Sequence, residues 1–213
     1  MAVLELRQYT MVPGRRQDFV DIFDREFVET QEALGIEVVG QFTDLDRPDR
    51  YVWIRRFPDM ERRATALEAF YSGPVWVEHS AAANATMTEW HDVLLLRPAG
   101  EVDDLAVSVA GRLPHGRTAV ESNPLVVLVW DVPPDRLAGF AVAVESAFPG
   151  ARATFITEPS PNTYPRLPIR EDASVVVAML DGQPPADGAA LDGVSPSQVL
   201  RLAPTLRSAL RGA

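Results

Sequence analysis

Two residue types are missing from this chain of 213 residues. It has no cysteine and no lysine, so all 20 basic residues are arginine. Without cysteine there can be no disulfide, no thiolate metal site and no thiol nucleophile. Without lysine there can be no Schiff base and no lysine general base. Both absences exclude classes of chemistry before any motif is considered.

Long apolar runs and an excess of positive charge are missing too. The longest apolar run, Leu125–Trp130, is far too short to span a bilayer. Charges at Glu5 and Arg7 come too early for a secretory signal. The net charge of −10 argues against a nucleic-acid or anionic-membrane partner. We therefore expect a cytoplasmic protein without nucleic-acid partners and without membrane insertion.

Alternating and helical patterns follow one another in the order βαββαβ over the first hundred residues. Strands are expected over 3–10, 36–43, 51–57 and 92–97. A first helix should begin at Pro13-Gly14 and end at Gly35, and a second should begin after Asp59 and be split at Gly73-Pro74. The apolar stripe of the first helix has five members: Phe19, Ile22, Phe23, Phe27 and Leu34. This order is typical of a ferredoxin-like α+β unit.

The second half of the chain resembles a weaker copy of the first. Pro133-Pro134 leads into a helical pattern, and strands are expected over 125–130, 151–158, 174–180 and 199–204. Residues 181–197 are rich in Gly, Pro and Asp and predict a loop where the first half has its split helix. We predict tandem ferredoxin-like units over 1–99 and 122–213, joined by a connection over 100–121.

One face of the first predicted sheet mixes aromatic and charged residues. They lie at alternate positions of two strands: Glu5, Arg7, Tyr9, Tyr51, Trp53 and Arg55. An open ferredoxin-like sheet would leave this face in water, where large aromatics are unfavourable. We therefore expect two sheets to close into a barrel with the mixed face lining its interior.

Four motifs of the first half resemble the NIPSNAP family. They are Leu6-Arg7-Gln8-Tyr9-Thr10, Pro13-Gly14, Asp49-Arg50-Tyr51-Val52-Trp53-Ile54-Arg55 and Ala69-Phe70-Tyr71-Ser72-Gly73-Pro74-Val75-Trp76. A looser resemblance to two-unit bacterial members runs over 122–206. The resemblance implies a fold of the dimeric α+β barrel type. That superfamily also contains cofactor-free monooxygenases and haem-binding enzymes. The resemblance itself implies fold more than function.

The stretch 68–87 holds the first group of candidate site residues. Trp76 and His79 share a helix face, and Asn84 follows one turn beyond. His79 could move a proton or ligate haem iron, although a histidine bonded to a backbone carbonyl is the commoner case. His91 and His115 receive no predicted role. Asn84 could orient a substrate oxygen or bond to local backbone.

The mixed face supplies the second group of candidates. Arg7 and Arg55 beside Tyr9 and Trp53 could bind a carboxylate, phenolate or enolate and stack on its apolar part. Alternatively, Glu5 neutralises both arginines in a buried network. The Pro-rich run with Asn162, Tyr164 and Arg166 could be a lid over the barrel mouth, but we favour an extended strap that covers a sheet edge.

The leading hypothesis is a protein that binds a small, partly aromatic or acidic molecule in the barrel interior. Whether it is an enzyme is left open. A cofactor-free oxygenase or isomerase would use Arg7 and Arg55 to hold an enolate and His79 to move the proton. No cofactor and no metal are expected in that case. Two alternatives are haem binding through His79 and a filled barrel that acts as an interaction protein. A homodimer is compatible with all three.

Overall fold

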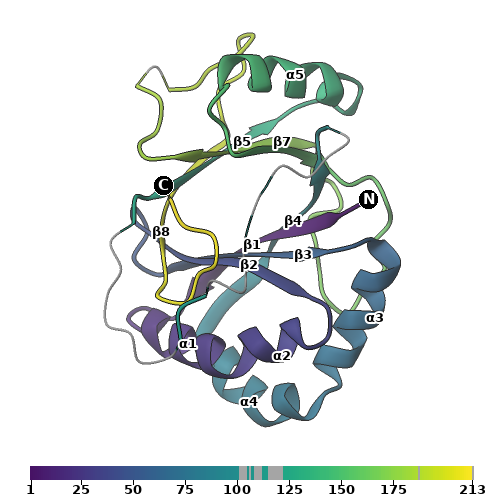
Figure 1. Ribbon diagram of the computed structural model, residues 1–213, viewed down its shortest axis with the longest axis vertical. Helices are drawn as coiled ribbons and strands as arrows, with labels where there is room; N and C mark the ends of the chain where they lie inside the picture. Colours follow the sequence, from purple (N-terminus) through teal and green to yellow (C-terminus); the bar gives the residue numbers. More distant parts are fainter. Residues whose placement is uncertain (101–104, 106, 108–111, 115–121, 187, 213) are drawn as a thin grey trace.

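The computed structural model describes residues 1–213 except 101–104, 106, 108–111, 115–121, 187 and 213 (Figure 1). Its described strands form one closed barrel in the order β1-β3-β2-β8-β5-β7-β6-β4. Their bounds are β1 Val3–Met11, β2 Glu37–Asp44, β3 Arg50–Phe57, β4 Met87–Pro98, β5 Leu125–Asp131, β6 Ala153–Thr157, β7 Val175–Asp181 and β8 Gln198–Pro204.

The barrel consists of two four-stranded sheets with the same strand order. The first reads β4-β1-β3-β2 and the second β8-β5-β7-β6, so corresponding strands take corresponding places. All pairs are antiparallel, and the sheets join where β2 meets β8 and where β4 meets β6. This is the arrangement expected of tandem ferredoxin-like units that close an α+β barrel, and it confirms the predicted fold class.

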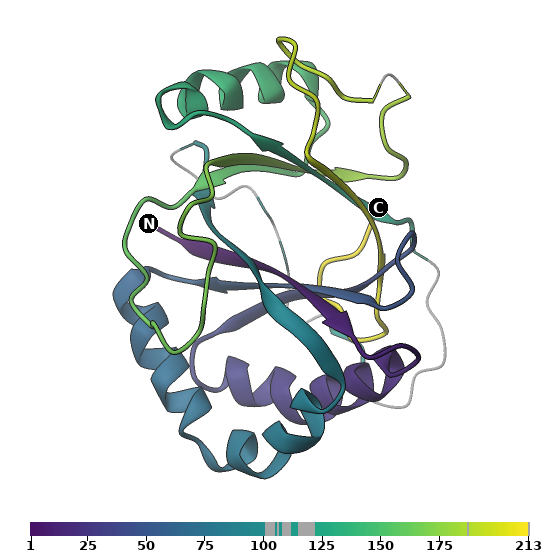
Figure 2. The same cartoon turned by 180° about the vertical axis from the view of Figure 1, so that it is seen from behind.

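The helices lie outside the barrel on two opposite sides (Figure 1). Those of the first half cover one side and α5 covers the other, and the reverse view shows the same separation (Figure 2). The helices are α1 Arg16–Ile22, the π-helical turn η1 Phe23–Phe27, α2 Val28–Glu32, α3 Met60–Tyr71, α4 Pro74–Asn84, the 3₁₀ turn η3 Pro134–Arg136 and α5 Leu137–Ala147. None of the helices described for this chain combines the length and apolarity that a membrane crossing requires.

The barrel interior is apolar. Side chains of both halves fill it, among them Leu6 and Ile54 from the first and Val127 and Met179 from the second, all fully buried. An eight-stranded barrel is just wide enough for its side chains to fill. The interior is therefore a core shared by both halves.

The mixed face of β1 and β3 does not line this interior, so that prediction is wrong. Arg7 and Trp53 point away from the barrel and lie beneath the helices of the first half, where Trp53 packs against Phe23. The opposite face, with Leu6 and Ile54, points inward. Alternation defines two faces but not their coverings. Both faces of this sheet are covered. The more apolar face lines the barrel interior, and the face that mixes aromatic and charged residues packs against the helices.

Three further details differ from the sequence expectations or extend them. The first helix contains the turn η1 and ends at Glu32, and Leu34 is exposed rather than part of the apolar stripe. Strand β4 begins at Met87, five residues earlier than expected. Residues 182–197 contain no helix in their described part, as predicted. The expected connection over 100–121 and His115 lie largely or wholly outside the described residues.

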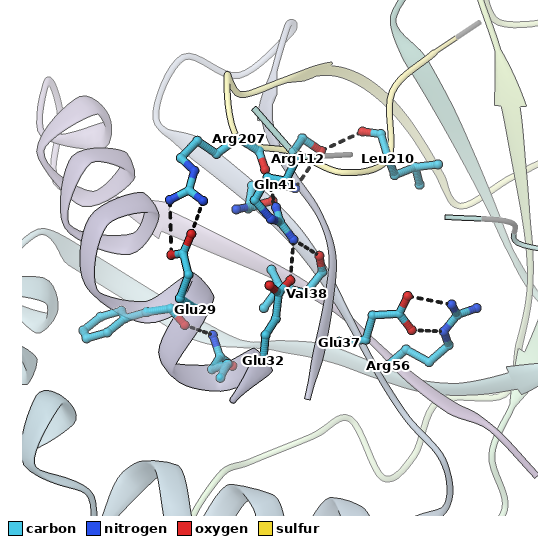
Figure 3. A network of polar contacts seen from close by, with 12 residues as sticks. Glu29, Glu32, Glu37, Val38, Gln41, Arg56, Arg112, Arg207 and Leu210 are labelled. Atoms are coloured by element: carbon cyan, nitrogen blue, oxygen red, sulfur yellow. Dashed lines mark hydrogen bonds and ion pairs between the residues drawn. The ribbon is translucent and has the colours of Figure 1, made fainter. Parts of the chain in front are cut away.

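The C-terminal segment after β8 is tied to the first half by arginines (Figure 3). Arg207 forms an ion pair with Glu29 of α2. Arg112, in the connection between the halves, donates to the backbone oxygen of Arg207. It also donates to Glu32 at 2.6 Å and to the backbone oxygen of Val38 at 2.7 Å. The two halves are thus linked on the helix side as well as through the barrel.

Candidate functional site

A cavity of about 220 Å³ lies on the helix side of the first sheet. Its walls come from β1, α3, α4, β4 and the segment 158–174, which descends from the second half along the first (Figure 2). The lining residues are Tyr9, Tyr71, Trp76, Asn84, Met87, Trp90, Tyr164, Arg166 and Leu167. Five of the nine are aromatic, which is typical of sites for small organic molecules. We call this cavity the aromatic pocket.

The break between α3 and α4 shapes one wall of the aromatic pocket. Gly73 caps α4 in an extended conformation, and a Cβ at this position would lie 2.9 Å from the backbone oxygen of Ala69. Pro74 then occupies the first helical turn, where its missing N–H costs nothing. The sharp turn sets Tyr71 and Trp76 edge to face, with ring centroids 4.7 Å apart.

The segment 158–174 supplies the opposite wall. Tyr164 stacks on Tyr71 with centroids 5.9 Å apart and an interplanar angle of 17°. Asn162 holds the segment in shape, because its Nδ2 donates to the Leu167 oxygen and its Oδ1 accepts from the Tyr164 N–H, each at 3.0 Å. The Arg170 N–H donates to Val93 of β4 at 2.8 Å. The segment therefore covers an edge of β4, as the strap alternative predicts, and also lines the pocket.

A smaller cavity of about 30 Å³ lies deeper and shares Tyr9, Tyr71 and Trp76 with the aromatic pocket. Trp53 and Gln31 contribute to its lining. The indole Nε1 of Trp53 is buried and has no hydrogen-bond partner among the described residues. A volume of this size holds about one water molecule.

A cluster of fully buried charges lies on the same sheet face, around Glu5. Its Oε2 accepts from Arg7 Nη1 at 2.6 Å and from Arg55 Nε at 2.7 Å, and its Oε1 accepts from Arg63 Nε at 2.7 Å. Burial alone would raise the pKa of Glu5, but Arg55, Arg7 and Arg63 outweigh it and hold that pKa far below its usual range. Glu5 is therefore a carboxylate at any ordinary pH. We call these four residues the arginine cluster.

Tyr9 connects the arginine cluster to the aromatic pocket. Arg7 Nε donates to the Tyr9 hydroxyl at 2.8 Å, and the Tyr9 ring belongs to the pocket wall. Burial raises the pKa of Tyr9, and Arg7 opposes that rise only in part. The hydroxyl is thus protonated at neutral pH and keeps its own proton to donate.

The structure brings three of the predicted site residues together at the pocket. Tyr9, Trp76 and Asn84 line it, and Trp53 lies one layer below at the smaller cavity. Asn84 ends α4 and is exposed at the rim.

The other three predicted residues lie elsewhere. Arg7 and Arg55 are fully buried in the arginine cluster and do not line the pocket. His79 lies on the η1 side of α4, with Nε2 3.5 Å from a carboxylate oxygen of Glu26. A haem iron ligated by His79 would therefore lie outside this pocket. Within the described ranges, no three or more His, Asp or Glu side chains are grouped so as to hold a metal ion.

Sequence reasoning missed Arg63, Trp90 and Leu167. Arg63 falls on the apolar stripe of α3 with Leu67 and Phe70, and a charge within such a stripe is a signal that could have found it. Trp90 lies in the part of β4 that precedes the expected strand. Leu167 follows the Pro-rich run, and nothing in its local pattern marks it.

Fold and pocket together define the class of protein. It is an α+β barrel of the kind called dimeric, here closed by the two halves of a single chain, with a pocket on the helix side of its first half. A family model described as NIPSNAP matches residues 4–100. The match confirms the resemblance to this family over residues 4–100. No curated protein matches the sequence.

Solved structures with similar folds include two that match almost the whole chain. A candidate monooxygenase from Fusobacterium nucleatum has a TM-score of 0.58 and 9% identity, covering 95% of this chain and 92% of that one. A candidate monooxygenase from Lactobacillus acidophilus has a TM-score of 0.56 and 14% identity, covering 95% and 93%. A NIPSNAP family protein from Agrobacterium tumefaciens covers 46% of this chain and 93% of its own, with a TM-score of 0.43 and 16% identity. At these identities the two long matches show the fold alone.

Proposed function

We propose that this protein binds a small planar organic molecule in the aromatic pocket. The observation that carries the proposal is the composition of the pocket wall, in which five aromatic side chains from five segments surround about 220 Å³. Tyr71 is nearly parallel to Tyr164 and edge to face with Trp76, so the wall offers ring faces and edges against which a flat molecule can pack. The volume suits a ligand smaller than a typical drug.

The polar groups at the rim complement this apolar wall. Asn84 offers an amide that can donate and accept, and Arg166 offers a guanidinium. Arg166 is exposed and lies 3.7 Å from Glu68, so its pairing with that carboxylate is weak. The ligand is thus stacked inside and oriented from the rim.

The proposal concerns binding, not a reaction. The enolate chemistry expected from the sequence needs Arg7, Arg55 and His79 around one substrate. Arg7 and Arg55 are buried beneath the pocket, and His79 faces Glu26 on another side of α4. The location also changes, because the ligand would lie between sheet and helices and not in the filled, apolar barrel interior.

Tryptophan fluorescence provides the test, because Trp76 and Trp90 both line the pocket. Saturable quenching by 4-nitroanisole, 4-nitrophenol or a 4-nitrobenzyl trimethylammonium salt would report a planar molecule in the pocket. Trp76→Ala should weaken the binding of whichever probe binds by at least about tenfold, or ~1.4 kcal/mol, through lost stacking.

Val77→Ala is the matched control. Val77 is the next residue on α4, is 67% exposed and does not line the pocket, so this variant should bind as the wild type does. Absence of saturable binding for all three probes would overturn the proposed function. Equal affinities of Trp76→Ala and the wild type would do the same.

A further inference from the structure

The arginine cluster carries more positive than negative charge. Arg7, Arg55 and Arg63 contribute three positive charges and Glu5 contributes one negative charge, which leaves +2, and all four side chains are fully buried. Among the described residues no second carboxylate forms an ion pair with these guanidiniums. Buried charge without compensation is costly. The net positive charge of the arginine cluster therefore calls for a compensating negative group.

The other partners of the arginine cluster are neutral. Arg55 donates to the Gln31 amide oxygen at 3.1 Å, and Arg63 donates to Asn162 and Thr163 at 3.1 and 3.2 Å. The Nη2 atoms of Arg7 and Arg63 have no hydrogen-bond partner in the described part of the chain. Two guanidinium nitrogens of the arginine cluster are thus left without an acceptor in the described part of the chain.

Two guanidiniums of the arginine cluster lie directly behind aromatic residues of the pocket wall. The Arg7 guanidinium lies 5.5 Å from the centroid of the Tyr9 ring, and that of Arg55 lies 6.0 Å from the Tyr71 ring. Both rings line the aromatic pocket, whose wall includes no Asp or Glu and one further arginine, Arg166. A cationic ligand would meet the positive charge of the arginine cluster from below, whereas an anion would be attracted from that side. At the rim, Glu68 lies 3.7 Å from Arg166 and offsets part of its charge.

Tyr9 is the residue that both contacts the arginine cluster and lines the aromatic pocket. Its hydroxyl is therefore the candidate group through which the cluster would act on a ligand. It accepts from the Arg7 guanidinium, which polarises its O–H bond and makes it a stronger donor. None of the described residues accepts its proton. A hydroxyl backed by a fixed positive charge favours an oxygen that carries negative charge.

We infer that the aromatic pocket selects planar molecules bearing an ionised oxygen, a phenolate or an aromatic carboxylate, and that the Tyr9 hydroxyl donates to that oxygen. This rests on the proposed function, because the ring of the ligand must occupy the aromatic pocket. To the proposed function it adds the negative charge of the ligand and Tyr9 as the residue that recognises that charge.

Three probes that share a nitrophenyl ring and differ in charge test the inference. At a pH where 4-nitrophenol is ionised, it should bind at least about tenfold more tightly than neutral 4-nitroanisole, and the 4-nitrobenzyl trimethylammonium salt should bind most weakly. The absorption spectrum gives a second readout, because bound nitrophenol should stay ionised at a pH where the free probe is mostly neutral. Failure of every probe would remove the proposed function, whereas equal affinities for the first two would overturn only this inference.

Tyr9→Phe isolates the recognising group, since it removes one oxygen and keeps the ring. The ratio of nitrophenolate to nitroanisole affinity should fall from about tenfold or more to near one. Tyr51→Phe is the matched control, because Tyr51 is the cross-strand partner of Tyr9, its buried hydroxyl has no partner among the described residues, and it does not line the pocket. An unchanged ratio in Tyr9→Phe, or an equal fall in both variants, would overturn the role of Tyr9. If Tyr9→Phe does not fold, the wild-type ranking of the three probes still decides whether the pocket selects anions.

Discussion

Asp24 is a buried carboxylate in the π-helical turn η1, away from the pocket. Gln41 Nε2 lies 3.3 Å from its Oδ1, and Arg207 donates to its backbone oxygen at 2.8 Å. Burial raises the pKa of Asp24 from 3.8 to about 6, and Arg207 and Arg112 only partly oppose the rise. A folded-state pKa above the unfolded value means that the stabilising, protonated form is lost as pH rises through about 6.

Asp24→Asn should therefore stabilise the protein at neutral pH. At about pH 8 the gain in free energy of unfolding should be about 1–3 kcal/mol, because asparagine avoids a buried charge and can still accept from Gln41. At about pH 4, where Asp24 is protonated in the folded state, the two proteins should differ little. Urea unfolding at several pH values measures the difference. Asp172→Asn, at an exposed position in the segment 158–174, is the control, because the charge of Asp172 is not among those that shift the pKa of Asp24. A destabilised Asp24→Asn at pH 8 would contradict the assignment.

Residue alternation along β1 and β3 predicts part of the site. It predicts that Glu5, Arg7 and Tyr9 share one face, which the structure confirms, and the alternative of a network in which Glu5 neutralises Arg7 and Arg55 describes their contacts. Alternation cannot predict whether the helices or the second sheet cover that face, because the side chains of both faces repeat every two residues. Arg63 comes from a helix 58 residues away from Glu5, and local pattern carries no information about such a contact.

At the level of elements, the segment 158–174 depends on Asn162 for its shape. Asn162→Ala removes the hydrogen bonds to Leu167 and Tyr164 and one of the contacts with Arg63. Such bonds are worth about 1 kcal/mol each, so the segment should loosen while the barrel stays folded. Amides over 163–168 should exchange faster, and the affinity for 4-nitrophenolate should fall about tenfold.

Ser160→Ala is the control for this segment. Ser160 lies two residues before Asn162, bonds to Glu158 and does not line the aromatic pocket, so both exchange and affinity should stay at the wild-type level. If Asn162→Ala bound the probe as tightly as Ser160→Ala does, the segment would not be a wall of the binding site.

Element boundaries follow sequence where the chain carries a steric signal. Gly73-Pro74 predicts the break between α3 and α4, and the structure confirms it, because glycine and proline restrict the backbone locally. The turn η1 has no such signal. Phe19, Phe23 and Phe27 all pack on the sheet, and the wider π turn lets residues four apart stay on one side. Tertiary packing of the rings, which sequence spacing does not encode, selects that turn.

For the whole molecule, the cohesion of the two halves comes from the barrel interior more than from the seams. Each seam has three paired positions, whereas β1 pairs with β3 over eight and β5 with β7 over seven. The interior side chains of both halves form one cluster. Neither sheet could bury its inner face without the other, so each half should depend on the other for its stability.

Leu6→Ala tests this dependence. Leu6 lies on β1 and is fully buried in the shared interior, so its truncation should cost about 2–5 kcal/mol. Because Val127 and Met179 share that interior, amides of β5 and β7 should lose protection against hydrogen exchange together with those of β1 and β3, in a single unfolding transition. Val142→Ala, at an exposed position on α5, should change stability by less than about 0.5 kcal/mol. If β5 and β7 kept their wild-type protection in Leu6→Ala while β1 and β3 lost theirs, the halves would be independent folding units joined edge to edge.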